Sequence, residues 1–190
     1  MKEIKRLFAQ IDLKKQQLDA KRPLPKHTIQ SLREKLFLEW TYNSNAIEGN
    51  TLTINETKVV LEGITVGGKT MREHLEVINH RDAISYVEDI VANDDPFSEC
   101  QIKNLHRLVL KGIDDRYAGV YRDQQVFISG ATHIPPAPLK NQEQMDALMN
   151  WYNGSAKELH PIVRGAMLHT IIDGIHPFID GNGRTSRLLL

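Results

Sequence analysis

Apolar residues recur every three or four positions along most of the chain, which is the spacing of amphipathic helices. The pattern predicts helices over residues 2–20, 28–40, 53–63, 70–91, 98–112, 141–152 and 161–175, with another from Arg184 onward. Capping boxes mark three of these starts, namely Thr53 with Glu56, Thr70 with Glu73, and Ser98 with Gln101. We expect Asn43-Ser44-Asn45 to interrupt the second helical pattern and Gly49-Asn50 to end it.

One stretch has strand character. Residues 125–128 and 132–134 are rich in β-forming side chains and flank Ser129-Gly130-Ala131, and Pro135-Pro136 closes the segment. This pattern predicts a short β-hairpin. Because two strands alone are marginal in water, the hairpin should pack on the helices. The expected fold is therefore all-α, a helical bundle with one β-hairpin.

Composition narrows the class of protein. The 190 residues carry 24 Lys+Arg and 24 Asp+Glu, so the formal net charge is zero. Without a basic excess, binding of nucleic acid through bulk charge is not expected. Cys100 is the single cysteine, so no intrachain disulfide is expected. Neither a membrane span nor a secretory signal is visible, and we expect a cytoplasmic protein that binds no membrane.

The pattern of the last helix continues to the apolar end at residues 186–190. Native termini are usually polar or frayed. We therefore expect either that the chain is a fragment or that a partner covers this end.

Candidate chemistry concentrates in residues 176–187. A Gly181-Asn182-Gly183 turn that leads into a helix offers free N–H groups and a positive dipole end, which attract anions. Arg184 and Arg187 lie on one helical face and suit phosphate oxygens. Asp180 beside these groups indicates a divalent metal, and His176 can accept a proton near neutral pH. The set predicts phosphoryl- or nucleotidyl-transfer chemistry.

A rival constellation uses some of the same residues. His169, Asp173, His176 and Asp180 are spaced four, three and four, which on one continuous helix would suit the metal site of a hydrolase. Pro177 disfavours this arrangement because it breaks the helix after His176.

The string from His176 to Arg187 resembles the signature of the Fic family, His-Pro-Phe-x-(Asp/Glu)-Gly-Asn-Gly-Arg-x-x-Arg, at every position, and the resemblance covers roughly residues 42–190. It implies transfer of AMP from ATP to a Ser, Thr or Tyr hydroxyl of a target protein, or of the protein itself, with Mg²⁺. Gly183 supports AMP transfer, since the Doc-like branch carries Lys there. The alternative is a non-catalytic nucleotide-binding regulatory module of toxin–antitoxin type.

The resemblance also assigns roles to single residues. Phe178 resembles the buried anchor of the loop. The implied functional roles are the general base for His176, the Mg²⁺ ligand for Asp180, the α-phosphate cradle for Gly181, Asn182 and Gly183, and the β- and γ-phosphate ligands for Arg184 and Arg187.

A second motif, Ser44 to Gly49, resembles the inhibitory helix of the family, (Ser/Thr)-x-x-x-Glu-(Gly/Asn), in the subclass that carries it before the core. The resemblance makes Ser44, Glu48 and Gly49 inhibitory residues, with Glu48 paired to Arg187. It also implies a capacity for AMP removal and a homodimer that controls inhibition.

The hairpin resembles the family's flap, which binds the target segment by strand addition. Its residues Ile128, Ser129, Gly130 and Ala131 would approach the nucleotide, and the adenine pocket of the family comes from helices after the signature. The expected organisation is an N-terminal helical region at 1–41, the inhibitory helix with a helical extension at 42–95, and a Fic core at 96–190.

Overall fold

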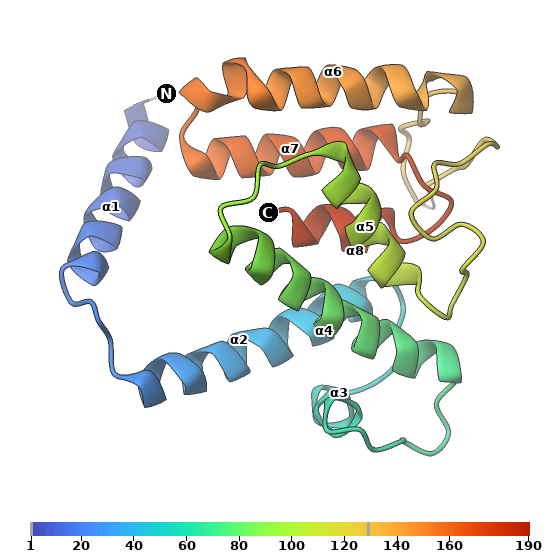
Figure 1. Cartoon of the computed structure of the whole chain (residues 1–190), viewed down its shortest axis with the longest axis horizontal. Helices are drawn as coiled ribbons and strands as arrows, with labels where there is room; N and C mark the ends of the chain where they lie inside the picture. The colour runs from blue at the N-terminus through green and yellow to red at the C-terminus, as the bar shows by residue number, and fades with distance from the viewer. Residues whose placement is uncertain (1, 129) are drawn as a thin grey trace. The chain divides into compact units, whose positions relative to one another are not determined.

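The computed structural model describes residues 2–128 and 130–190, and its regular secondary structure is helical (Figure 1). The chain divides into two compact units, Met1–Leu36 and Phe37–Leu190. Its elements are α1 (Lys2–Asp19), α2 (Lys26–Ile47), α3 (Ile54–Leu61), α4 (Met71–Ala92), α5 (Glu99–Leu110), η1 (Pro138–Lys140), α6 (Asn141–Asn153), η2 (Ser155–Glu158), α7 (Pro161–Ile175) and α8 (Asn182–Leu188).

The first unit contains α1 and the beginning of α2. The expected amphipathic helix forms, and its apolar side chains Leu7, Ile11 and Leu18 are exposed. An ion pair between Lys15 and Asp19, four residues apart, supports its last turn.

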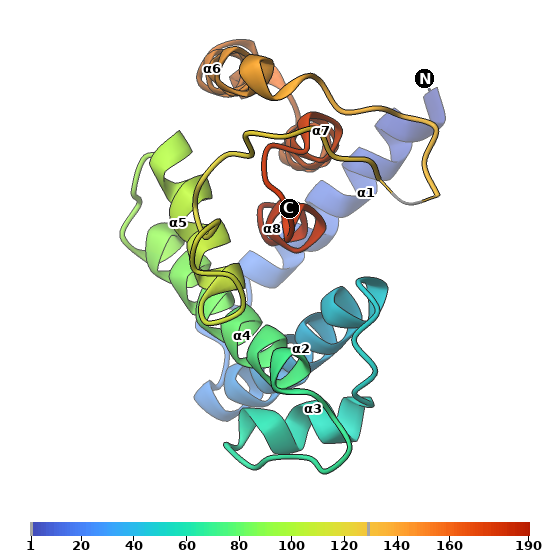
Figure 2. The same cartoon turned by 90° about the vertical axis from the view of Figure 1, so that its right-hand side faces the viewer.

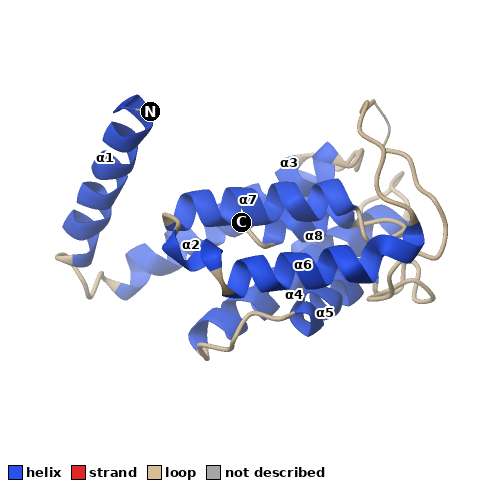
Figure 3. Ribbon diagram, turned by 90° about the horizontal axis from the view of Figure 1, so that it is seen from above, coloured by secondary structure: helices blue, strands red, loops and turns tan. Residues whose placement is uncertain are grey.

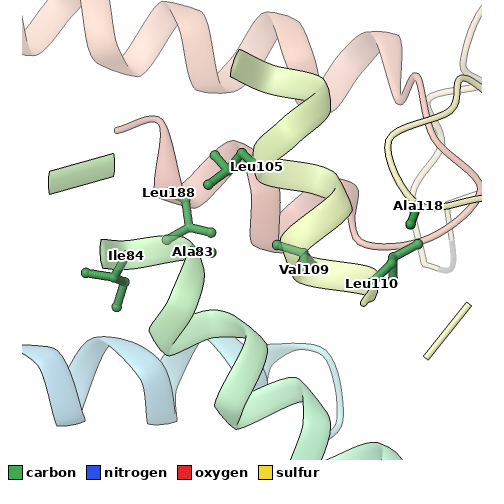
Figure 4. Packing of buried hydrophobic residues seen from close by; sticks show 7 residues of the cluster. All are labelled: Ala83, Ile84, Leu105, Val109, Leu110, Ala118 and Leu188. Carbon is green, nitrogen blue, oxygen red and sulfur yellow. The ribbon is translucent and has the colours of Figure 1, made fainter. Parts of the chain in front are cut away.

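The second unit is built around α8, which packs against α4, α5 and α7 (Figure 2). One buried cluster joins α4, α5 and α8, as Figure 4 shows with Ala83, Leu105 and Leu188. Another joins α5, α6 and α7, which places Met145 and Ile172 next to Phe178. Figure 3 shows α6 and α7 side by side. The loop between α7 and α8 is therefore fixed from several directions.

The capping boxes form as the sequence predicts. Thr53 Oγ1 accepts from the Glu56 N–H at 3.2 Å, and Glu56 Oε2 accepts from the Thr53 N–H at 2.7 Å. Thr70 and Glu73 make the same pair of bonds at the start of α4, at 3.2 and 2.8 Å. At the start of α5, Gln101 Oε1 accepts from the N–H of Ser98 at 2.9 Å. Each helix start therefore satisfies amides that would otherwise lack partners.

The expected interruption at Asn43-Ser44-Asn45 is wrong, because α2 continues through these residues to Ile47. The two asparagine amides donate to carbonyls one turn back, Asn43 to Glu39 at 2.7 Å and Asn45 to Thr41 at 3.0 Å. Their side chains therefore do not compete with the helix for its N–H groups. Asn45 is also buried, and it reaches the carbonyl of Glu76 on α4 at 3.4 Å.

The predicted β-hairpin is also wrong, since residues 2–128 and 130–190 contain no strand. The segment is a loop with a turn in which the Ala131 N–H donates to the Ile128 carbonyl at 3.1 Å. Side chains tie it down instead: Gln125 Nε2 donates to the Pro135 carbonyl at 2.9 Å, and His133 Nε2 contacts the Gly174 carbonyl at 2.8 Å. Pro135 and Pro136 lack the N–H groups that a ladder needs. Ser129 lies outside the described residues.

None of the described helices combines the length and the apolar character that crossing a bilayer requires.

Candidate active site

The candidate site begins where α7 ends. His176 adopts a left-handed conformation, with φ 50° and ψ 58°, and its N–H closes the helix on the Ile172 carbonyl at 2.9 Å. Pro177 then prevents continuation, as the sequence predicts. This turn takes Asp180 off the face of α7. Among the described residues no group of three His, Cys, Asp or Glu side chains could hold a metal ion, so the rival hydrolase site lacks its ligand cluster.

Phe178 anchors the loop after this turn. Its side chain is fully buried and stacks on the His106 ring of α5 at 3.6 Å between centroids, with the planes 4° apart. The amide of Asn182 binds the same residue twice, accepting from the Phe178 N–H and donating to its carbonyl, both at 2.9 Å. The first turn of α8 is therefore fastened to the beginning of the loop.

His106 supports the loop from below. Its Nδ1 accepts the Gly119 N–H at 2.9 Å, so Nε2 carries the proton and donates to the Asp180 carbonyl at 2.8 Å. Burial lowers the pKa of His106 to about 4, which keeps the ring neutral at pH 7. The sequence analysis missed this residue, which lies on a helix and belongs to no motif.

Arg122 is a second supporting residue that the sequence analysis missed. Its Nε donates to the His176 carbonyl at 2.8 Å, and its NH2 donates to the Pro136 carbonyl at 2.6 Å. It thus connects the backbone at Pro136 to the turn at His176.

The side chain of His176 is half-buried. Its Nδ1 lies 3.2 Å from the Asp173 carbonyl, which favours a proton on Nδ1 and leaves Nε2 as a free acceptor. Burial lowers the pKa of the ring below its ordinary value, and the nearby Asp173 groups oppose this shift. The neutral form that a general base requires is therefore favoured at pH 7.

Both carboxylate oxygens of Asp180 accept hydrogen bonds, two of which come from arginines. Oδ1 accepts the Gly181 N–H at 2.6 Å and Arg184 NH2 at 3.2 Å, while Oδ2 accepts Arg72 NH2 at 2.5 Å. Burial opposes ionisation, but Arg184, the Gly181 amide and Arg72 outweigh it and hold the pKa of Asp180 below its usual value. Its oxygens already attract cations, and hard oxygen donors are what Mg²⁺ prefers, so Asp180 fits the implied metal.

Arg184 lies beneath the loop with 2% of its side chain exposed. It pairs with Asp180 at 3.2 Å and with Glu76 Oε1 at 3.3 Å. Its Nε has no hydrogen-bond partner although the atom is buried. A buried guanidinium with an unused donor is suited to an anion such as a phosphate.

Arg187 meets the predicted inhibitory motif. Its Nε donates to Ser44 Oγ at 3.0 Å, and its NH2 donates to the Ser44 carbonyl at 2.9 Å and to Glu48 Oε1 at 2.6 Å. A Cβ atom on Gly183 would lie 2.4 Å from Glu48 Oε1, so this carboxylate rests against the first turn of α8. Gly49 follows with φ 91°, which ends the motif in a left-handed turn.

A cavity of about 330 Å³ lies beside Asp180. It is lined by Glu48, Gly49, Asn50, Thr70, Arg72, Glu73, Glu76, Asp180 and Arg184. The structure thus gathers the end of α2, the first turns of α4 and the signature loop around one space. The predicted flap residues do not line it: Ile128 is half-buried, Gly130 and Ala131 are exposed, and Ser129 is not described.

A family model described as Fic/DOC matches residues 96–190, which is half of the chain. The chain belongs to the Fic/DOC family. The resemblance in the sequence is therefore confirmed, and the site described above lies at the Fic signature.

Curated Fic relatives extend the similarity beyond this region. The chain is 40% identical over 160 residues to "Protein adenylyltransferase Fic" of Nematostella vectensis, covering 83% of this chain and 37% of that protein. It is 34% identical over 187 residues to the protein of the same name in Drosophila willistoni, covering 97% of this chain and 37% of that one. The chain thus spans little more than a third of the length of these relatives.

Solved Fic structures share the fold. A Fic domain containing signaling protein from Bacteroides thetaiotaomicron superposes with a TM-score of 0.85 at 32% identity, covering 96% of this chain and 69% of that one. Fic-1 from C. elegans gives a TM-score of 0.83 at 32% identity, covering 99% and 56%. The helical part of the fold prediction is confirmed.

Proposed function

We propose that this Fic protein transfers AMP from ATP to a Ser, Thr or Tyr hydroxyl of a target protein, and that Glu48 restrains the transfer. The observation that carries the proposal is the convergence of His176, Asp180, Arg184 and Arg187 at one loop and helix start. Relatives named protein adenylyltransferase support the same activity.

In the proposed reaction, His176 Nε2 removes the proton of the target hydroxyl, whose oxygen attacks the α-phosphorus of ATP. The bond from that phosphorus to the bridging oxygen breaks, and pyrophosphate leaves. The backbone N–H groups of Asn182 and Gly183 would hold the α-phosphate at the start of α8, because the Gly181 N–H and the Asn182 side chain are already bonded to Asp180 and Phe178. Arg184 and Arg187 would bind the β- and γ-phosphates.

Asp180 would hold Mg²⁺ together with the phosphates. A bound Mg²⁺ ion would supply charge neutralisation at the transferring and leaving groups. The remaining contribution of the protein is positioning, because in-line attack is sensitive to misplacement of the α-phosphate by about 1 Å.

Restraint follows from the ion pair at 2.6 Å between Glu48 and Arg187. A guanidinium that is occupied by Glu48 and Ser44 cannot receive the γ-phosphate in the same geometry. ATP bound without that contact would be misaligned, and misalignment of this kind costs on the order of 10²-fold in rate.

The experiment is labelling with ATP that carries a tag on its α-phosphate, in whole-cell lysate. We expect Glu48→Gly to raise incorporation about 10²-fold, and addition of His176→Ala to abolish it. Glu62→Gly is a matched control at the end of α3, remote from the signature loop, and should behave as the wild type. Absence of label on every protein would contradict the proposal, and nucleotide binding without labelling would favour the non-catalytic regulatory module.

Two finer features belong to the same proposal. The segments on either side of residue 129 would receive the target, and the exposed Phe127 and Ile134 support this by offering apolar contacts. The Glu48 carboxylate, set against Gly183, could orient a water for AMP removal. A homodimer and a cytoplasmic location stay predictions.

A further inference from the structure

Arg72 reaches the candidate site from α4, an element that neither sequence motif includes. It lies in the first turn of α4, outside the signature and the inhibitory motif, and its NH2 reaches Asp180 Oδ2 at 2.5 Å. Its Nε donates at the same time to Glu76 Oε1 at 3.1 Å. The two carboxylates therefore hold the guanidinium over the cavity beside Asp180.

The oxygen that Arg72 contacts is the one that a metal would need. Asp180 Oδ1 is already engaged by the Gly181 amide and by Arg184, which leaves Oδ2 facing Arg72. With no group of three ligand side chains among the described residues, a cation bound at Asp180 depends on substrate phosphates for further ligands. A cation held in this way binds weakly enough for a single guanidinium to compete with it.

The two arginines at Asp180 differ in their freedom to move. Arg184 has 2% of its side chain exposed, whereas Arg72 has 56% exposed. Arg72 can therefore leave Asp180 by rotation of its own side chain, while α4 stays anchored by the Thr70–Glu73 capping box. Arg184 has no such route, because it is enclosed.

We propose that the Arg72 guanidinium occupies the divalent-cation position at Asp180 in the resting protein, and that Mg²⁺ arriving with a nucleotide must displace it. The proposal rests on the proposed function, since it takes Asp180 as the metal ligand. Two consequences follow in opposite directions. Arg72 raises the Mg²⁺ concentration that nucleotide binding needs, and without metal it shields the nucleotide phosphates from the charge of Asp180.

The test measures ADP binding by calorimetry in EDTA and at increasing Mg²⁺, in wild type and Arg72→Gln. ADP is the probe because it lacks the γ-phosphate whose proposed ligand is held by Glu48. In Arg72→Gln we expect the half-saturating Mg²⁺ concentration to fall about five-fold, the size of a partly exposed ion pair. In EDTA we expect ADP to bind about five-fold more weakly than to wild type. Arg72→Lys, which keeps the charge, should restore both values toward wild type.

Arg81→Gln is the matched control, because Arg81 lies on the same helix and pairs with Asp82. It removes the same charge and should leave both values unchanged. An unchanged Mg²⁺ requirement in Arg72→Gln would overturn the inference and leave the proposed function standing, as would weaker ADP binding at saturating Mg²⁺, which would make Arg72 a phosphate ligand. Absence of ADP binding in every variant would overturn both.

Discussion

Gly183 lies where Glu48 meets Arg187, and its missing side chain makes that meeting possible. A Cβ atom there would lie 2.4 Å from Glu48 Oε1 and 2.9 Å from Arg187 NH1. We predict that Gly183→Ala lowers the free energy of unfolding by about 1 kcal/mol, because the ion pair must be displaced. Urea unfolding measures the change.

The effect of Gly183→Ala on the free energy of unfolding should change sign when Glu48 is absent. In a Glu48→Gly background the Glu48 obstruction is gone, and the end of the Arg187 side chain, released from its ion pair, can shift away from the new methyl group. Alanine is the better helix former, so Gly183→Ala should then stabilise by about 0.5 kcal/mol. This double-mutant cycle isolates the contact between residues 48 and 183. Equal effects in both backgrounds would show that the Glu48 carboxylate does not rest on Gly183.

At the scale of residues, the structure contains contacts that the sequence motifs predicted, while the functional roles of these residues stay predictions. Arg184 of α8 pairs with Asp180 of the preceding loop, and Ser44 and Glu48 reach Arg187. Arg72 and His106 could not be found this way. Their contacts to Asp180 cross 108 and 74 positions of sequence, and no local pattern encodes such a distance.

Among the elements, α4 contacts both the segment at Thr51 and the loop at Asp180. Glu73 caps its first turn and also accepts the Thr51 N–H at 3.0 Å and the Thr51 hydroxyl at 2.6 Å, which ties the segment after the predicted inhibitory motif to this helix. The Thr51 and Thr70 hydrogen bonds lower the pKa of Glu73 to about 2. The carboxylate is therefore ionised and capping at any pH near neutrality.

We predict that Thr70→Ala lowers the free energy of unfolding by about 1 kcal/mol, because the helix loses the oxygen that accepts the Glu73 N–H. Thermal or urea unfolding measures the loss. Thr170→Ala is a suitable control, since Thr170 is exposed on α7 and bonds only within its own helix, to the Ala166 carbonyl. A loss in Thr170→Ala as large as in Thr70→Ala would contradict the assignment to the cap.

Element prediction succeeded where local chemistry decides the structure. Capping residues fixed the starts of α3, α4 and α5, and Pro161 and Pro177 bracketed α7. It failed where tertiary contacts decide. Asn45 extends α2 because α4 buries and binds it, and the described residues on either side of position 129 form no strand because side chains such as Gln125 and His133 bond the backbone there instead.

For the whole molecule, buried histidines make stability depend on pH. Burial lowers the pKa of His80 to about 3 and of His106 to about 4, from 6.5. Between pH 6.5 and about pH 4, these two histidines therefore bind protons in the unfolded chain but not in the folded chain. Stability is complete above pH 6.5 and is lost as the pH falls toward 4.

We predict that the free energy of unfolding at pH 5 is roughly 4 kcal/mol lower than at pH 7, about 2 kcal/mol for each of these two histidines. Urea unfolding at both pH values measures the difference. Imidazole NMR should show His106 still neutral, with its proton on Nε2, at pH 5. A difference below about 1 kcal/mol would mean that neither ring is shielded from water as described.

The double hydrogen bond between Asn182 and Phe178 has a consequence for ligand recognition. These two bonds join the loop to the first turn of α8, and the Phe178 ring is buried in the core. The loop has therefore lost most of its backbone freedom before any ligand binds. Association then requires little further ordering of this segment, so more of the contact energy is retained as affinity. The backbone of this loop therefore keeps one conformation during binding, and the surrounding side chains make the remaining adjustments.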